Sequence, residues 1–314
     1  MELKSDYSSS LLSDDRDLSL SEIERRSKST GWIFYSLAGS IIFTSCNLFM
    51  VELSKEGLYG YLFFCYGTLF ASCAFFLHRM NMAYSKRGRY FKWSDLYILN
   101  SNTGRIKWGT VVGLLLYSLM YQGGNILTIL AFQYSSLSGV NQGIIISIYS
   151  MVPIWSAAIA YYVYKEKLQW NHCIGMVMLS LCMALISLSN IYDKDTRVQQ
   201  PPPNASELEI LTYNPSFPVC LALVATFLLG INMNLVKYYD RKGFPADVFA
   251  YACYGFTNFI QALISFIVFY YYGFNFTFFI FGFCGSFLNT LGLVFVALAV
   301  SSGLSGPSSA LVNL

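Results

Sequence analysis

The chain is a succession of long apolar stretches separated by short polar segments. Each stretch holds at least about 20 residues, which is the length that an α-helix needs to cross the hydrocarbon core of a bilayer. Barrel strands would be half as long and would alternate strictly, whereas helices satisfy their own backbone hydrogen bonds in lipid. The pattern therefore predicts eight membrane-spanning helices, at Gly31–Val51, Leu58–Leu77, Trp108–Tyr134, Gly139–Tyr164, Asn171–Asn190, Pro218–Lys237, Asp247–Tyr272 and Phe276–Val300.

Charged residues lie between these stretches or at their ends. With the N-terminus placed in the cytoplasm, 17 of the 20 Lys and Arg fall on the inner side, and only Lys55, Lys194 and Arg197 fall on the outer side. Such a bias sets the orientation of membrane proteins. We therefore expect a cytoplasmic N-terminus, and the sequon Asn204-Ala205-Ser206 on the outer side makes Asn204 a glycosylation candidate.

Composition excludes several classes of protein. Hydrophobic residues make up 55% of the 314 residues, charged residues only 12%, and the mean hydropathy is +0.48. Soluble domains have about a quarter of their residues charged. A soluble enzyme and a nucleic-acid-binding protein are therefore not expected, and a net charge of +3 is too small to indicate a polyanionic partner.

The polar segments divide the chain into four parts. Residues 1–30 are rich in Ser, Asp and Arg and predict a disordered cytoplasmic tail, and the long apolar stretch behind them is not a cleavable signal peptide. Residues 191–217 contain Pro201-Pro202-Pro203 and predict an extended outer linker. This linker separates two membrane regions, residues 31–190 and residues 218–314.

The two membrane regions share short motifs in the same order. Cys65-Tyr66-Gly67 matches Cys253-Tyr254-Gly255, and Asn47-Leu48 matches Asn234-Leu235. Ser-rich segments ending in Gly follow the third and eighth spans. A repeat of five spans reverses the orientation of its second copy, because five is an odd number. The motifs therefore predict an inverted-topology repeat, in which a central site can face each side in turn.

The fourth and fifth spans resemble those of a known family. The segment Ser150-Met151-Val152-Pro153-Ile154-Trp155 is followed by Ala160-Tyr161-Tyr162, Glu166 and Gly175. This is similar to the EamA-type proteins of the drug/metabolite transporter superfamily, with a Pro in helix four, a Glu at its cytoplasmic end and a Gly entering helix five. Gly306-Pro307 resembles the start of helix nine of that family.

The resemblance implies an all-α fold of ten helices in two inverted five-helix repeats. Eight complete spans and the start of a ninth are present, so the last one to two helices would lie beyond Leu314. It also implies transport by alternating access, through a cavity lined by helices one, three, four, six, eight and nine.

Uncharged polar residues within the spans are the candidates for a solute pathway. Asn47 and Asn234 occupy equivalent places in the two repeats, and we expect them to face one another near the centre. The cavity implied by the resemblance adds Gln122, Asn125, Asn141, Tyr149 and Asn289. The alternative is that each amide only joins helices, with roughly 0.6 kcal/mol per contact.

Small or helix-breaking residues lie near the middle of two spans. Gly123 and Gly124 in the third span and Pro153 in the fourth can act as hinges, and the alternative is close helix packing. The eight Cys have no metal-ligand spacing, and no nucleophilic triad or phosphate loop is present. We therefore expect neither an enzyme nor a metal or cofactor.

These features together predict a secondary carrier for a small organic metabolite. No Asp or Glu lies deep in a span, which favours uniport or exchange over proton coupling. Of the basic residues only Lys237 could reach inward, which favours a neutral or zwitterionic solute. A nucleotide-sugar or phosphorylated-metabolite antiporter and a non-transporting scaffold or receptor remain alternatives. The expected partners are the solute, the bilayer and a second copy in a homodimer, with the plasma membrane and the endomembranes both open as the location.

Overall fold

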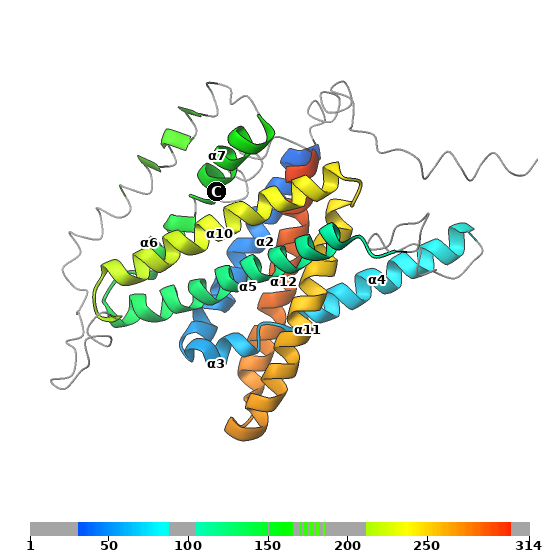
Figure 1. Ribbon diagram of the computed structural model, residues 1–314. Helices are drawn as coiled ribbons and strands as arrows, with labels where there is room; N and C mark the ends of the chain where they lie inside the picture. The colour runs from blue at the N-terminus through cyan, green and yellow to red at the C-terminus, as the bar shows by residue number, and fades with distance from the viewer. Residues whose placement is uncertain are drawn as a thin grey trace, which may run out of the picture.

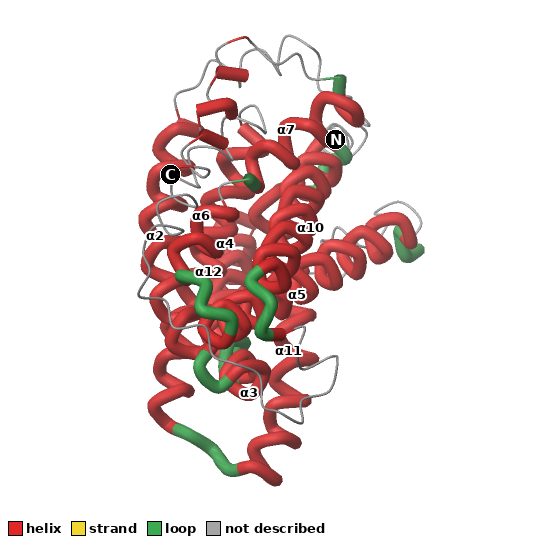
Figure 2. Tube along the Cα trace, turned by 90° about the vertical axis from the view of Figure 1, so that its left-hand side faces the viewer, coloured by secondary structure: helices red, strands yellow, loops and turns green. Residues whose placement is uncertain are grey.

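A computed structural model describes residues 31–87, 105–149, 151–165 and 212–302, with short pieces between residues 170 and 185. These ranges contain helices joined by turns and no β-strand (Figures 1 and 2). The helices are α2 (Gly31–Ser54), α3 (Gly57–Leu62), α4 (Tyr66–Arg87), α5 (Trp108–Leu137), α6 (Gln142–Tyr149), α7 (Val152–Tyr164), α10 (Ser216–Arg241), α11 (Ala246–Tyr272) and α12 (Phe276–Ser302).

Seven helical segments of the described residues are long and apolar enough to cross a membrane. They are α2, α3 with α4, α5, α6 with α7, α10, α11 and α12. This confirms seven of the predicted spans and makes the chain an integral, multi-pass membrane protein. The predicted span Asn171–Asn190 lies largely outside the described residues, as do residues 1–30, Asn204 and the segment after residue 302.

Two predicted spans are divided, which the hydrophobic pattern does not show. The second span turns at Phe63–Cys65, between α3 and α4. The fourth span is divided between Tyr149 and Val152. Pro153 then falls in the first turn of α7, where its missing N–H is not needed.

The long helices pack in two main pairs. α12 lies along α2, and α10 lies along α5. In Figure 1 the α5–α10 pair crosses the α2–α12 pair at a steep angle, with α11 and α4 beside the crossing. α7 and α6 cover α10 on the opposite side. The described helices therefore enclose a common centre, at which α3, α5, α11 and α12 meet.

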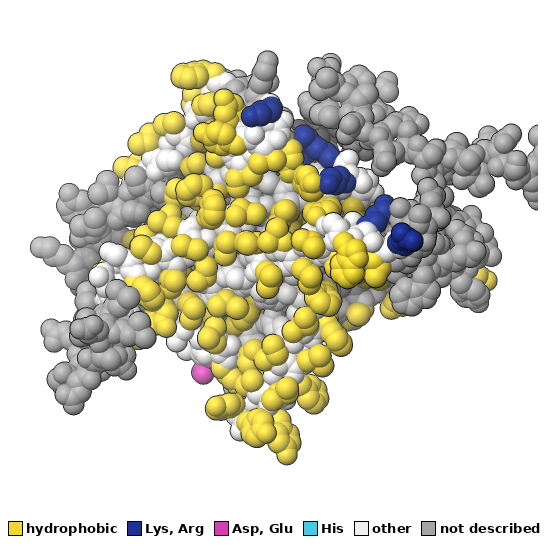
Figure 3. Space-filling view, viewed as in Figure 1, with side chains coloured by type: hydrophobic (Ala, Val, Ile, Leu, Met, Phe, Trp, Pro, Cys, Tyr) yellow, Lys and Arg dark blue, Asp and Glu magenta, His cyan; other side chains and the backbone are white. Residues whose placement is uncertain are grey.

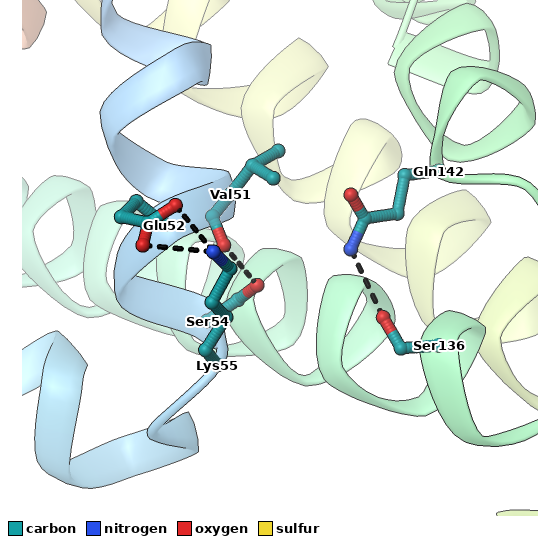
Figure 4. A network of polar contacts seen from close by, with 6 residues as sticks. All are labelled: Val51, Glu52, Ser54, Lys55, Ser136 and Gln142. Carbon is teal, nitrogen blue, oxygen red and sulfur yellow. Dashed lines mark hydrogen bonds and ion pairs between the residues drawn. The ribbon is translucent and has the colours of Figure 1, made fainter.

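Contacts at the two ends of the bundle show that the helices alternate in direction. At one end Tyr59 Oη donates to the carbonyl of Gly273 at 3.0 Å, and the rings of Tyr134 and Phe217 lie 5.2 Å apart. Figure 4 shows three short-range contacts in segments that begin or end at this end of the bundle. They join Glu52 to Lys55, Ser54 to Val51 and Gln142 to Ser136.

The opposite end is rich in basic residues, and we call it the basic end. There Arg79 pairs with Asp247 at 3.4 Å, and Tyr239 Oη donates to the carbonyl of Gly109 at 2.7 Å. Figure 3 shows Lys and Arg gathered along one edge of an otherwise apolar surface. The described basic residues that belong to segments meeting at this end are Arg79, Arg105, Lys107, Lys165, Arg241 and Lys242.

The turn between α3 and α4 and the start of α4 press directly on α12. A Cβ on Gly67 would overlap the carbonyl oxygen of Phe283, and a Cβ on Gly282 would lie 2.5 Å from the carbonyl oxygen of Phe63. Small residues allow two membrane helices to approach this closely. Backbone therefore meets backbone along this contact.

Replacing Gly67 with Ala is expected to lower the apparent melting temperature of the purified protein. The added methyl group would force α4 and α12 apart, at a cost of about 1–3 kcal/mol. Gly109→Ala is the matched control, because a Cβ there meets nothing within 4 Å. Thermal unfolding followed by size-exclusion chromatography in detergent measures both variants. Equal melting temperatures would contradict the tight contact.

Candidate solute-binding site

The candidate site lies at the turn that divides the second span. α3 ends at Leu62, and the carbonyl of Tyr61 accepts a hydrogen bond from the N–H of Phe64 at 2.9 Å. A second bond to this carbonyl comes from Nε2 of Gln261, on α11, at 2.8 Å. Because the helix is interrupted here, the carbonyl of Tyr61 can accept a hydrogen bond from a side chain of another helix.

Three side chains close a ring of hydrogen bonds here, which we call the amide ring (Tyr61, Gln122 and Gln261). Tyr61 Oη donates to Oε1 of Gln122, and Nε2 of Gln122 donates to Oε1 of Gln261 at 3.0 Å. Gln261 returns to the carbonyl of Tyr61. The amide ring joins α3, α5 and α11 within the membrane-spanning part of the chain.

A second group of buried polar residues, the phenol cluster, lies beside the amide ring (Tyr117, Tyr121, Tyr254 and Asn289). Tyr117 and Tyr254 share a hydrogen bond between their hydroxyls. Nδ2 of Asn289, on α12, donates to Tyr121 Oη at 2.6 Å. The rings of Tyr121 and Tyr254 lie 4.7 Å apart. Three phenols and one amide therefore meet among α5, α11 and α12.

Asn125 connects the two groups and has a hydrogen-bonding atom left over. It lies one turn beyond Tyr121 on α5, close to the phenol groups of both Tyr61 and Tyr121. Its side chain is 7% exposed, yet Nδ2 has no hydrogen-bond partner. A buried donor without an acceptor costs about 1–3 kcal/mol. Nδ2 therefore lies near two phenol oxygens without forming a hydrogen bond to either, and a bound polar acceptor could take it up.

The structure brings some of the predicted pathway residues together and leaves others apart. Gln122, Asn125 and Asn289 belong to the candidate site. Tyr149 donates to Thr128 Oγ1, one turn beyond Asn125 on α5. Asn141 is exposed, and its Oδ1 accepts from the N–H of Gly143 at 2.7 Å at the start of α6.

The two equivalent asparagines do not hydrogen-bond to each other. Asn47 is half-buried on α2. Asn234 is 4% exposed on α10, and its Nδ2 donates to the carbonyls of Ser156 and Gly230 at 3.1 and 2.9 Å. Oδ1 of Asn234 has no partner. Asn234 therefore links α10 to α7, outside the amide ring and the phenol cluster.

The hinge candidates differ in their surroundings. α5 continues without interruption through Gly123 and Gly124, and a Cβ on either would lie 3.4 Å from a Leu side chain of α10. This is a packing contact between helices. Pro153 is buried at the start of α7, next to the division of the fourth span.

The site also contains residues that the sequence analysis did not select. Tyr117 and Tyr121 precede the predicted pathway residue Asn125 at intervals of four residues, so they share one face of α5 with it. Tyr254 belongs to the repeated Cys-Tyr-Gly motif. Their hydroxyl groups recur at helical spacing, which is a signal that could have identified them, although of the tyrosines only Tyr149 was expected in the pathway.

Charged groups lie near the ends of the described spans, with one exception. Glu52 pairs with Lys55 at 2.7 Å, Asp247 with Arg79, and Oδ1 of Asp240 accepts from the N–H of Ala246 at 3.3 Å. Lys237 is instead only 5% exposed on α10. Among the described residues, no three His, Cys, Asp or Glu lie together as metal ligands.

No protein-family model and no curated protein matches this chain. What the site can do therefore follows from its own groups.

Asn125→Leu is expected to leave the apparent melting temperature unchanged or to raise it. This substitution removes a buried donor that has no partner, while Gln261→Leu removes two hydrogen bonds and leaves Nε2 of Gln122 without its acceptor. We expect Gln261→Leu to destabilise the protein by about 1–3 kcal/mol. Thermal unfolding in detergent compares the two variants. A larger loss with Asn125→Leu would show that Asn125 is needed for the fold.

Proposed function

We propose that this chain is a secondary carrier that moves a small organic solute across the membrane by alternating access. The observation that carries the proposal is the buried amide and phenol site with an unused N–H on Asn125. A solute with hydroxyl, carbonyl or amide groups could bind there by replacing its hydrogen bonds to water.

Unpaired polar groups distinguish this proposal from a membrane scaffold. Amides that only tie helices together should be paired, because an unpaired polar group in hydrocarbon is costly. Asn232 is 1% exposed on α10, and neither its Oδ1 nor its Nδ2 has a partner. Asn125 and Asn234 each have one such atom. These groups favour a pathway that takes up polar molecules.

The helix pairing supports the inverted repeat that we propose for the chain. The shared motifs make α2 equivalent to α10, α4 to α11, and α5 to α12. If each helix is replaced by its equivalent in the other repeat, the α2–α12 contact becomes the α10–α5 contact, and the α4–α12 contact becomes the α11–α5 contact. Both members of each pair are present. Such an arrangement suits a ten-helix carrier of the EamA type, in which two repeats rock around a central site.

We expect uptake of a polar solute by the full chain reconstituted in liposomes. A panel of labelled neutral, zwitterionic and anionic metabolites identifies the solute. Asn125→Leu should lower its uptake about five- to thirtyfold, since a hydrogen bond worth about 1–2 kcal/mol is lost. Gln142→Leu is the matched control, because this amide pairs with Ser136 at 3.0 Å in an exposed contact away from the site.

The same liposomes test whether transport is coupled to protons. Acidic side chains of the described spans lie near helix ends, so we propose uniport or exchange. Removing the pH gradient at constant membrane potential should leave the rate unchanged. Specific uptake of no solute in the panel would instead favour a scaffold or receptor.

The orientation that we propose places the basic end in the cytoplasm and Asn204 outside. Cysteines introduced at Lys242 and Lys55, in a background without reactive cysteines, should label from opposite sides of intact cells. We expect an impermeant thiol reagent to label the Lys55 position. Labelling of the Lys242 position alone would reverse the orientation.

A further inference from the structure

A row of aromatic rings in mutual contact leads from the basic end to the phenol cluster, and we call it the aromatic ladder (Tyr239, Phe249, Tyr117 and Tyr254). The ring of Tyr239, near the end of α10, is stacked on that of Phe249, on α11, with centroids 4.8 Å apart. Phe249 meets Tyr117 edge to face at 5.5 Å, and the centroids of Tyr117 and Tyr254 are 5.6 Å apart. Since Tyr117 and Tyr254 belong to the phenol cluster, the aromatic ladder joins the candidate site to the basic end.

Tyr239 is the outermost member of the aromatic ladder. It is 9% exposed, whereas Phe249 and Tyr254 are completely buried. Its neighbour Tyr238 is exposed, and α10 ends two residues later at Arg241. Tyr239 therefore separates the deeper rings of the aromatic ladder from the basic end.

Two glycines of α5 form a notch that holds the phenol group of Tyr239. The carbonyl of Gly109 accepts a hydrogen bond from Tyr239 Oη at 2.7 Å. A Cβ on Gly113, one turn further along α5, would lie 2.0 Å from both Cζ and Oη of Tyr239. The ring therefore rests directly on the backbone of α5, and a side chain at position 113 would displace it.

The side chain of Tyr239 can leave this notch while its helix stays in place. The carbonyl of Tyr239 accepts a hydrogen bond from the N–H of Phe244 at 3.0 Å, so the turn between α10 and α11 holds the backbone. The side chain is attached to α5 by the hydrogen bond to Gly109. A tyrosine at the edge of the apolar region has one wet end, and water can replace a carbonyl as the partner of its hydroxyl. Rotation of the side chain thus exchanges one partner for another and uncovers Phe249.

The candidate site is closed separately at the end opposite the basic end. Leu53, Phe64 and Phe132 are at most 1% exposed and form one hydrophobic cluster with Tyr61. Tyr239 belongs to a different cluster, which contains the other rings of the aromatic ladder. Apolar layers therefore lie on both sides of the buried polar groups, and a movement of Tyr239 would open only one of them.

We propose that Tyr239 is a lid over the route between the basic end and the phenol cluster. The route is closed when the phenol group lies in the notch of Gly109 and Gly113, and open to a solute when the phenol group points into the water at the basic end. The inference rests on the proposed carrier function and deepens it, because it names the residue that controls access to the candidate site from one side of the membrane.

The native Cys253 can report whether the lid is open. It is completely buried on α11, one turn deeper than Phe249, and its thiol lies near the hydroxyls of Tyr117 and Tyr239. The experiment uses the full chain with the other seven of its eight Cys replaced by Ala. A membrane-impermeant methanethiosulfonate is applied to sealed vesicles of both orientations. Lys242→Cys in a chain without other cysteines identifies the vesicles whose basic end faces the reagent.

Tyr239→Ala should raise the labelling rate of Cys253 from the basic end about tenfold, because both the hydrogen bond and the ring contact that close the lid are lost. Labelling from the opposite end should not change. Tyr239→Phe should give a smaller increase, since it keeps the contact with Phe249. Tyr238→Ala is the matched control, because Tyr238 is the adjacent residue and its ring lies 4.3 Å from Nζ of Lys242, outside the aromatic ladder.

Gly113→Ala tests the notch from the other side of the contact. Its methyl group would occupy the place of the phenol group, so labelling of Cys253 from the basic end should again become faster. Combined with Tyr239→Ala it should give no further increase, since no ring is left to displace. Substitutions that only loosen the helix bundle would instead add their effects and speed labelling from both ends.

The outcomes separate the lid from the carrier. An unchanged labelling rate in Tyr239→Ala, or an equal increase from both ends, overturns the lid even if the chain transports a solute. A one-sided increase without uptake of any solute of the panel supports the lid and overturns the carrier. If Tyr239→Ala does not survive purification, Tyr239→Phe decides: faster labelling from the basic end alone supports the lid, and an unchanged rate overturns it.

Discussion

Hydrocarbon offers a polar group no partner other than another group of the protein, and this constraint governs the whole structure. It explains why the described chain is helical and why each interruption of a helix is compensated. At the turn between α3 and α4, Gln261 donates to the carbonyl of Tyr61. At the division of the fourth span, the N–H of Met151 bonds to the carbonyl of Ile148 at 2.9 Å. Interruptions are thus tolerated where neighbouring groups complete the hydrogen bonding.

The same constraint separates two kinds of buried polar side chain. The amide ring is closed, so its members hold α3, α5 and α11 together. Asn125, Asn232 and Asn234 each have an unpaired atom. The first kind builds the bundle, and the second kind gives it groups that can exchange partners. The carrier that we propose would need both, because its solute must bind in a place that is stable when the solute has left.

The hydrophobic pattern predicted seven of the described spans, because membrane thickness sets the length of an apolar helix. It could not predict the turn at Phe63–Cys65, which contains neither Gly nor Pro. It missed Tyr121 and Tyr254 because a phenol is apolar over most of its surface and its hydroxyl matters only once a partner faces it. Lys237 seemed to end its span, but α10 continues for another turn to Arg241. How deep a side chain lies in the membrane depends on where its helix ends, and the local sequence predicts a helix end only to within about one turn.

The contact of Gly67 and Gly282 with opposing backbone also limits how the molecule can move. Helices separated by a layer of side chains can slide, because rotamers change as the ridges pass one another. Here no such layer exists, so the turn between α3 and α4 and the facing part of α12 behave as one rigid body. At Gly123 and Gly124 leucine side chains lie between α5 and α10. Sliding of α4 along α12 would therefore cost more than sliding of α5 along α10, because the contacts at Gly67 and Gly282 are with backbone and those at Gly123 and Gly124 are with leucine side chains.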